Sequence, residues 1–422
     1  MNEEREKWKR WTSLSEEIEN EIGPYLKETD RIAEINQYRV LKAFRAHQVN
    51  ESHLIPSTGY GYDDLGRETL ERVFADCFGA EAALVRPQFI SGTHAIATAL
   101  FGVLRPGDEL LYITGNPYDT LEEVIGIRGQ GNGSLKDFGI SYRPVPLGKD
   151  GRPDREAIRA AIGPRTKVAA IQRSRGYADR PSFSISDIRD MIGWVKEKNP
   201  NCIVLVDNCY GEFVEEREPC HVGADLVCGS LIKNPGGGLA KTGGYIAGKK
   251  ELVELCANRL SAPGIGLEGG ATLYTLPDMY QGLFIAPHVV AQAVKGALFA
   301  AALFEHFGLE TRPGSREKRT DIIQSVIFQD AGRMIEFCRA IQEASPVNSH
   351  VIPQPSPMPG YADPVIMAAG TFVQGASIEL SADGPLRPPY IVFLQGGLTY
   401  EHVKIALLSS IDRLKERGLI RI

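Results

Sequence analysis

A lysine on a glycine-rich segment, Lys233, has the clearest chemical potential of any residue in this sequence. It follows the apolar run 226–232 and precedes three glycines, 236–238. Upstream, Asp207 ends another apolar run, 203–206. A lysine amine can form a Schiff base with an aldehyde, and a buried aspartate can keep a pyridine nitrogen protonated. The pair, in this order and context, predicts a pyridoxal phosphate (PLP) enzyme.

Other interpretations of the same residues remain open. Asp207 could simply cap a following helix, and Lys241 is a competing lysine. The segment 236–242 weakly resembles a P-loop, so a nucleotide-binding ATPase is an alternative, although Ala240 stands where that motif requires glycine. We prefer Lys233 because it directly follows the apolar run.

Three residues, Ser91, Gly92 and Thr93, stand where a helix is expected to begin, shortly after an apolar run. Free backbone N–H groups at a helix start can hold a phosphate group, and the two hydroxyls would add donors. A simple helix cap is the alternative for the same residues. Ser230, three residues before Lys233, is a further candidate for phosphate contact.

Tyr118 lies just past the apolar run 109–113. Ligands of open α/β sheets sit beyond the carboxyl ends of the strands, so its ring could stack on a pyridine ring. An ordinary loop tyrosine is the alternative. The glycine pattern at 264–269 matches Gly-x-Gly-x-x-Gly, but a helical stretch precedes it, so we expect a mobile loop near the site and not a dinucleotide site.

Short apolar runs alternate with helical patterns between residues 80 and 250. This alternation predicts parallel βαβ units and an α/β fold. The expected strands are 82–85, 109–113, 168–171, 203–206, 226–228 and 245–247, and the expected helices are 93–104, 154–162 and 185–198.

The two ends of the chain have a different character. We expect a helical arm at 1–60, an α/β domain that binds the cofactor at 61–285 and a smaller α+β domain at 286–422. Within the last we expect mainly helix at 285–345, a proline-rich loop at 346–364, strands at 365–380 and 390–394, and a closing helix at 400–417.

Composition excludes several classes of protein. The net charge is −6 and the basic residues are scattered, which argues against a nucleic-acid partner. Seven cysteines without a Cys-x-x-Cys pair argue against disulfides or a metal site and favour a reducing, cytoplasmic location. The most apolar stretch, 284–307, contains charged residues and proline, so we expect a buried helix and no membrane span.

Several segments resemble a known family over nearly the whole chain. The most distinctive are 57–62 (STGYGY), 89–94 (FISGTH), 172–177 (QRSRGY), 207–212 (DNCYGE), the Lys233 segment and 395–399 (QGGLT). They resemble the fold type I PLP enzymes of cysteine and methionine metabolism, whose fold is aspartate aminotransferase-like. They are most similar to the bacterial cystathionine β-lyase or methionine γ-lyase-like subgroup, also called aluminium-resistance proteins.

The resemblance implies roles for individual residues. Lys233 would form the internal aldimine, Asp207 would pair with the ring nitrogen, and Tyr118 would stack on the ring. The phosphate would lie at Ser91, Gly92 and Thr93. Tyr60 resembles a tyrosine that these enzymes donate to the phosphate across a dimer interface, so the resemblance implies a homo-oligomer, dimer or tetramer, with active sites near the interface.

The sequence departs from the better-known lyases at two places. Ile232 replaces a threonine that contacts the phosphate, and the strand expected to carry the carboxylate-binding arginine has none. Arg387, Arg173 and Arg175 are the candidates for that role.

The resemblance implies a carbon–sulfur lyase that eliminates a thiol from a sulfur-containing amino acid. Alternatives are aldol cleavage, transamination or a PLP-binding protein without useful turnover.

Overall fold

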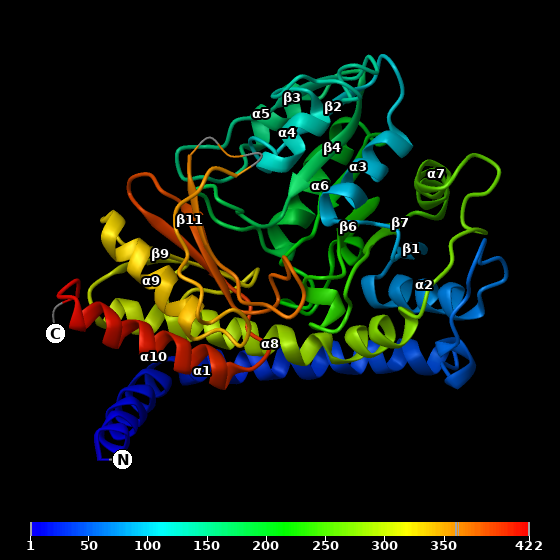
Figure 1. Ribbon diagram of the computed structural model, residues 1–422. Coiled ribbons are helices and arrows are strands. Elements are labelled where there is room, and N and C mark those ends of the chain that lie inside the picture. The colour runs from blue at the N-terminus through cyan, green and yellow to red at the C-terminus, as the bar shows by residue number, and fades with distance from the viewer. Residues whose placement is uncertain (1, 359–360, 362, 421–422) are drawn as a thin grey trace. The chain divides into compact units, whose positions relative to one another are not determined.

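The computed structural model describes residues 2–358, 361 and 363–420 (Figure 1). Two compact units emerge: one comprises residues 35–286, and the other joins residues 1–34 to 287–422. This division differs from the expected arm at 1–60. The first helix, α1 (Asn2–Ala46), runs without a break through residue 34, so its two parts are assigned to different units.

The unit of residues 35–286 is built on a seven-stranded sheet with the order β1-β7-β6-β5-β4-β2-β3. The pairs β2/β3, β2/β4, β4/β5 and β5/β6 are parallel, and β7 is antiparallel to both neighbours. The mostly parallel sheet that the alternation predicts is therefore confirmed. The strands are β1 (Ala82–Arg86), β2 (Glu109–Tyr112), β3 (Ser141–Pro144), β4 (Thr166–Gln172), β5 (Ile203–Asp207), β6 (Leu226–Ser230) and β7 (Gly244–Gly248).

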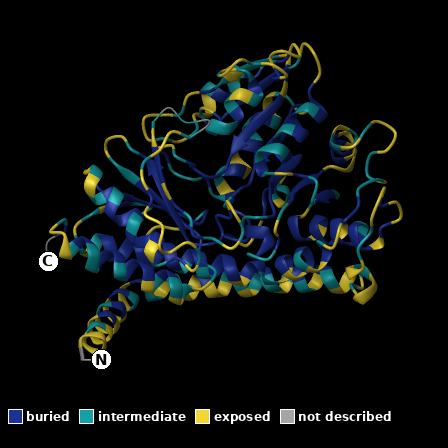
Figure 2. Ribbon diagram, viewed as in Figure 1, coloured by how far each residue is buried: buried dark blue, intermediate teal, exposed yellow. Residues whose placement is uncertain are grey.

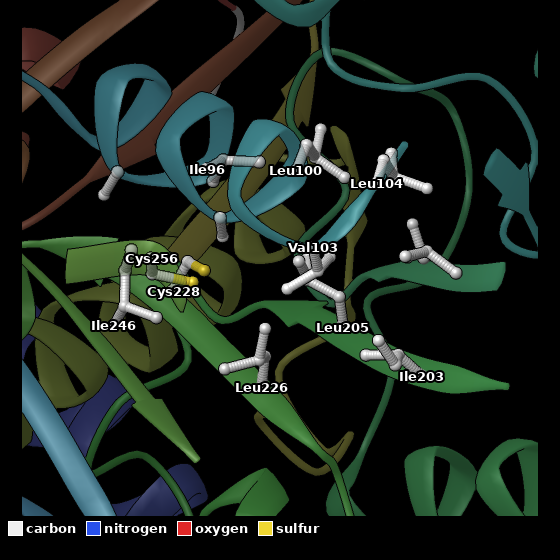
Figure 3. Close-up of a cluster of buried hydrophobic side chains, with 14 of the residues drawn as sticks. Ile96, Leu100, Val103, Leu104, Ile203, Leu205, Leu226, Cys228, Ile246 and Cys256 are labelled. Carbon is white, nitrogen blue, oxygen red and sulfur yellow. The ribbon is translucent and has the colours of Figure 1, made fainter. Parts of the chain in front are cut away.

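One face of this sheet is covered by α3 (Gly92–Val103) and α7 (Lys250–Leu260). Figure 3 shows Ile96 and Leu100 of α3 above Leu205, Leu226 and Ile246 of the strands. All five side chains are buried, and their removal from water stabilises the fold by about 1.5–3 kcal/mol each. This packing fixes the strand ends on which the candidate residues stand.

The opposite face carries α2 (Leu65–Phe78). Phe74 and Phe78 of this helix pack on the Tyr245 ring of β7, with centroids 5.9 and 4.8 Å away. Tyr245 is adjacent in sequence to Ile246 and points to the other side, as alternation along a strand requires. The remaining helices of the unit are α4 (Asp119–Ile125), α5 (Arg155–Ala161) and α6 (Ile185–Lys198).

The other unit contains an antiparallel sheet with the order β10-β11-β12-β9-β8. Figure 2 shows the strands of both sheets as largely buried. Helix α9 packs against this sheet and against α10. The elements are β8 (Glu310–Arg312), β9 (Ile323–Ile327), α9 (Ala331–Glu343), β10 (Val365–Ala368), β11 (Ser381–Pro385), β12 (Ile391–Gln395) and α10 (Tyr400–Glu416).

The expectation that 285–345 is mainly helical is confirmed, because α8 (Leu276–His306) and α9 together span more than half of it, with β8 and β9 between them. One expectation for this unit is wrong. The expected strand 365–380 ends at Ala368, and the chain forms turns before β11 begins at Ser381. The predicted closing strand and helix are confirmed as β12 and α10, within a residue or two at each end.

Helix α8 is long and apolar enough to cross a membrane by length and composition, and 72% of its apolar window is buried inside the protein. Such burial is typical of the core helix of a soluble protein.

Candidate active site

The carboxyl ends of β5 and β6 bring the two principal candidates to one edge of the sheet. Asp207 is the last residue of β5 and pairs in register with Cys228 of β6. Lys233 follows the end of β6 by three residues and directly precedes a short 3-10 helix, Asn234–Gly236. Parallel strands end at the same edge, so the chain delivers a lysine and an aspartate to the place where α/β proteins bind ligands.

The ammonium of Lys233 lies over the Tyr210 ring, with Nζ 4.0 Å from the ring centroid. Tyr210 has a φ of 74°, so the loop after β5 turns in the left-handed region to present this ring. Burial lowers the pKa of Lys233, but the acidic side chains beside it, Cys209 and Asp207 among them, outweigh burial and raise it overall. Lys233 is therefore a partly buried amine whose acidic neighbours favour its charged form.

Asp207 is buried, and its Oδ1 accepts a hydrogen bond from the Cys209 N–H at 3.1 Å. Burial raises the pKa of Asp207, while the positive charges of Lys233 and Arg180 oppose this shift. A further cation close to Asp207, such as a protonated pyridine nitrogen, would favour the carboxylate. The site thus has the electrostatic character that a pyridinium partner needs.

Ser91, Gly92 and Thr93 form the start of α3, as expected. Ser91 is the N-cap, and its hydroxyl accepts from the His94 N–H at 3.1 Å, so the alternative of a helix cap holds for this residue. Its hydroxyl hydrogen is still available to donate. The Thr93 hydroxyl lies 2.8 Å from that of Thr120.

Gly92 comes close to the end of β6. A Cβ at this position would stand 3.3 Å from the Ser230 Cβ and 3.4 Å from the Cys209 Sγ. The start of α3, Ser230 and the loop after Asp207 are therefore in direct contact. The Ser230 hydroxyl is buried and has no hydrogen-bond partner among the residues that the structure describes.

Tyr118 lies beyond β2 and caps α4. A Cβ on Gly176 would be 2.9 Å from the Tyr118 Cδ2 and 3.4 Å from the Gln172 Nε2, so the three residues are neighbours. Gln172 in turn pairs in register with Asp207. Tyr118 is thus placed on the same edge of the sheet as Asp207. It follows β2, and β4 lies between β2 and the strand that ends in Asp207.

Tyr60 is 80% exposed and stacks on Tyr62 with a centroid separation of 5.6 Å. Within residues 35–286 its ring therefore lies on the surface, and its role toward a phosphate stays a prediction.

The three candidate arginines differ in their surroundings. The guanidinium of Arg173 is fully buried and bonds to Glu215 at 3.0 Å and to Asn208 at 2.8 Å, so the structure does not support it as a substrate carboxylate ligand. Arg175 is buried beside Asp179 at 3.5 Å. Arg387 belongs to the other unit, where it is half-exposed and pairs with Asp363 at 3.0 Å. The roles of Arg175 and Arg387 stay predictions.

The residues behind the ATPase alternative do not form a phosphate site. The Lys241 side chain is 75% exposed, and its ammonium pairs with Asp278 at 2.8 Å. The glycine pattern at 264–269 is also accounted for: Arg86 donates to the carbonyls of Leu267 and Gly269 at 2.9 Å each. This loop is anchored by hydrogen bonds, which does not favour the mobile loop expected there.

Sequence reasoning missed two buried side chains beside Asp207. Arg180 donates to the carbonyl oxygens of Gln172 and Ser174 at 3.0 and 2.7 Å, and its charge acts on Asp207. Gln172 is buried, and its Oε1 lacks a hydrogen-bond partner within the described part of the chain. The register of β4 against β5 places Gln172 beside Asp207, whereas Arg180 follows β4 and is identified only by its contacts.

The donor set suits PLP on independent structural grounds. Ser230 offers an unpaired buried hydroxyl, and Gly92 leaves the helix start open where any larger residue would meet Ser230. Asp207 would hold the ring nitrogen, and Lys233 would hold the aldehyde carbon. No cluster of three or more His, Cys, Asp or Glu residues that could hold a metal occurs in the described ranges.

Comparisons with known proteins agree with this geometry. The family model described as methionine gamma-lyase matches residues 11–415. An uncharacterized protein of Bacillus subtilis is 64% identical over 96% of each chain. A crystal structure from Listeria monocytogenes, of a candidate cystathionine beta-lyase involved in aluminum resistance, is 62% identical, with a TM-score of 0.94 over 95% of this chain and 99% of that one.

An L-methionine gamma-lyase of Pseudomonas putida is 30% identical over 56% of this chain and 51% of its own length. The expected α/β fold of the type I PLP enzymes is confirmed, and PLP is the cofactor. The chain belongs to the methionine gamma-lyase family of PLP-dependent lyases.

Proposed function

We propose that this enzyme is a carbon–sulfur lyase that eliminates a thiol from a sulfur-containing amino acid, of the cystathionine β-lyase or methionine γ-lyase type. The observation that carries the proposal is the convergence of Lys233, Asp207 and the unpaired Ser230 hydroxyl on adjacent strand ends. The family membership supports the same reaction class.

Bound PLP supplies an electron sink for the bond-breaking steps. The residues of the chain do the rest. Lys233 would anchor the cofactor at rest and, once displaced by the substrate amine, its Nζ would take the proton from the substrate Cα. Asp207 would keep the ring nitrogen protonated, and Tyr118 would hold the ring in place from one face.

The phosphate would rest on the start of α3. Free N–H groups of the first helical turn, with the hydroxyls of Ser91 and Thr93, can donate to phosphate oxygens. Ser230 would add a donor from the facing strand, at a position where its hydroxyl is otherwise unsatisfied. Ile232 contributes no hydroxyl, so Ser230 carries more of this contact than in the better-known lyases.

We also propose a homo-oligomer, dimer or tetramer, with Tyr60 at the interface. The Tyr60 carbonyl accepts from the Gly270 N–H at 2.8 Å, which aligns two surface segments. Both segments expose large apolar or aromatic side chains: Tyr60, Tyr62, Leu273 and Tyr274 are 53–80% exposed. A second copy of the chain would cover them and bring Tyr60 toward a neighbouring cofactor phosphate.

The substrate would be a small amino acid, with Arg175 or Arg387 as candidates for its carboxylate. Neither nucleic acid nor membrane is expected as a partner. The seven cysteines are free thiols, which supports a reducing, cytoplasmic location.

The reaction is tested with purified protein offered cystathionine, methionine, cysteine and homocysteine. Release of ammonia and a keto acid with a free thiol is the expected result. With cystathionine, pyruvate indicates cleavage at Cβ and 2-oxobutyrate cleavage at Cγ. A yellow protein that converts substrates only by amino transfer or aldol cleavage would contradict the proposal.

A further inference from the structure

The residues that follow Asp207 and Lys233 in the chain are both fully buried asparagines. The Asn234 side chain donates to the carbonyl oxygen of Glu212 at 3.0 Å. The Asn208 side chain donates to a Glu218 carboxylate oxygen at 2.9 Å. Both cofactor residues are thus tethered, through their neighbours, to polar groups behind the sheet edge.

These groups form one buried polar cluster. Arg173 pairs with Glu215 at 3.0 Å and lies 3.7 Å from Glu218, which also faces Arg39 at 3.5 Å. The charges of Arg39 and Arg173 therefore balance those of Glu215 and Glu218. The cluster consists of Arg39, Arg173, Asn208, Glu212, Glu215, Glu218, Asn234 and Tyr245.

Glu212 carries the third carboxyl group of the cluster, and no arginine of the cluster pairs with it. Its Oε1 accepts from the Tyr245 hydroxyl at 2.9 Å, and its Oε2 has no partner among the described residues. The side chain is fully buried, and Oε1 is so close to Gly229 that a Cβ there would lie 2.5 Å away. A buried carboxylate that has only neutral hydrogen-bond donors is disfavoured, whereas a protonated carboxyl group is not.

We propose that Glu212 is a positioning residue: its backbone carbonyl, through Asn234, holds the segment that carries Lys233, and its buried carboxyl group works in the protonated form. In this arrangement its ionisation at alkaline pH places a negative charge behind Lys233 and changes the proton affinity of that amine. The role assigned to Lys233 rests on the proposed function; the protonation of Glu212 does not.

The surroundings of Glu212 agree with this assignment. Burial, with the nearby Glu218 charge, raises the pKa of Glu212 to about 8, although its own backbone N–H, the Tyr245 hydroxyl and Lys233 oppose the shift. Groups that face it come from several elements. Among the titratable and charged groups, Cys209 follows β5, Lys233 follows β6 and Tyr245 belongs to β7. Glu218 precedes the 3-10 helix Pro219–Val222. Arg173 follows β4 and lies against Gly211, the residue before Glu212.

The first test is the stability of Glu212→Gln as a function of pH. An acid whose pKa is raised by folding lowers stability as pH rises from its unfolded value to its folded value. Glutamine copies the protonated acid at every pH. We therefore expect the difference in thermal midpoint between E212Q and the wild type to grow in favour of E212Q by about 3 °C between about pH 6 and pH 8. Above the pKa of Glu212 in the folded protein, this difference should grow no further.

The matched control is Glu109→Gln. Glu109 is also buried but stands at the amino end of β2 and pairs with Arg143 at 3.0 Å, and its pKa is lowered, chiefly by hydrogen bonds from Arg143 and Thr166 that outweigh burial. E109Q should lose stability and show no gain between pH 6 and 8. Equal pH dependence of E212Q and wild type, or an E212Q that is less stable than wild type near pH 6, would overturn the protonated assignment.

Tyr245→Phe provides a second variant if E212Q does not fold. The Tyr245 hydroxyl favours the ionised form of Glu212, so its loss should extend the fall in stability to higher pH than in wild type. If Y245F and the wild type lost stability over the same pH range, the proposal would be contradicted.

Coupling to Lys233 is read from the visible spectrum. The pH midpoint of the colour change that reports the proton on the Lys233–cofactor link should be lower in E212Q than in wild type, because the charge that forms on Glu212 is absent. An unchanged midpoint, together with a confirmed stability effect, would refute the coupling alone. A colourless protein would instead contradict the proposed function, while the stability test still reports on Glu212.

Discussion

Two charged regions of the unit 35–286 use buried polar groups in opposite ways. In the arginine cluster of Arg67, Arg86 and Glu71, the guanidinium groups donate to backbone carbonyls of residues 61 and 267–270, and Arg86 pairs with Glu71 at 2.8 Å. At the Lys233 edge, the Ser230 hydroxyl has no hydrogen-bond partner among the described residues. In the arginine cluster the Nε atoms of Arg67 and Arg86 also lack a hydrogen bond, but Arg86 Nε lies 2.8 Å from Glu71 and the other guanidinium N–H groups are directed at backbone carbonyls.

We interpret this difference as that between a structural cluster and a candidate binding site. Buried polar groups are normally hydrogen-bonded, and each exception calls for an explanation. The arginine cluster directs most of its guanidinium N–H groups to the backbone carbonyls of two loops and so holds them together. The Lys233 edge presents a hydroxyl donor, a carboxyl group and an amine. These are the groups that would hold the phosphate, the ring nitrogen and the aldehyde of the cofactor. Substitutions should therefore affect stability at the first region and cofactor binding at the second.

Lys233→Ala should have the largest effect. Loss of both the covalent anchor and the base should lower kcat by about 10⁴-fold, measured as keto acid release. Lys241→Ala is the matched control: that side chain is 75% exposed and pairs with Asp278, so activity should stay within about twofold. Equal losses in the two variants would mean that Lys233 has no special role in the reaction.

Arg86→Ala should reduce stability more than activity. Glu71 would lose its buried partner, a change that typically costs about 3–5 kcal/mol in the free energy of unfolding. Urea denaturation measures this effect. Arg72, an exposed residue of α2 that donates to Thr69, serves as the control, and R72A should cost less than about 1 kcal/mol. An R86A protein of unchanged stability would show that the arginine cluster is not structural.

Asp207→Asn should leave the fold intact and weaken catalysis by about 10²-fold, because the ring nitrogen would lose its charged partner. The isosteric amide can still accept from the Cys209 N–H, so the thermal midpoint should change little. Steady-state kinetics together with thermal unfolding test this split. A large loss of stability without loss of kcat would assign Asp207 to the structural class.

Ser230→Ala should have the smallest effect, about a tenfold loss of PLP affinity measured by titration of cofactor-free protein. Ser325 of β9 is the matched control, because its buried hydroxyl also has no hydrogen-bond partner in the described residues. S325A should leave the affinity unchanged. Equal affinities of S230A and wild type would mean that the unsatisfied Ser230 hydroxyl does not mark the phosphate site.

The fold could be predicted where the local composition alone indicates that a segment is buried. The continuous apolar runs at 203–206 and 226–228 became the central strands β5 and β6, and the run at 82–85 became β1 at the edge of the sheet. Strand β3 escaped detection because it is a half-exposed edge strand. Strand β11, with the sequence SADGP, was missed for another reason: its residues are buried by pairing with β10 and β12, although their composition disfavours strand.

The candidate site divides in the same way. Lys233 and Asp207 could be found because each follows a recognisable strand. The contacts of Gln172, Arg180 and Glu212 depend on the register between strands and on which loops meet behind the sheet edge. Gln172 and Glu212 lie in the segments 172–177 and 207–212 that resemble the family, but no local pattern encodes these contacts, so the contacts could be identified only from the structure.

The most direct measurement is the site of covalent attachment. Purified protein would be treated with borohydride, digested and analysed by mass spectrometry. The account predicts a reduced pyridoxyl phosphate group on the peptide that contains Lys233 and on no other. A modified Lys241 peptide, or a protein that carries no such group after incubation with PLP, would contradict it.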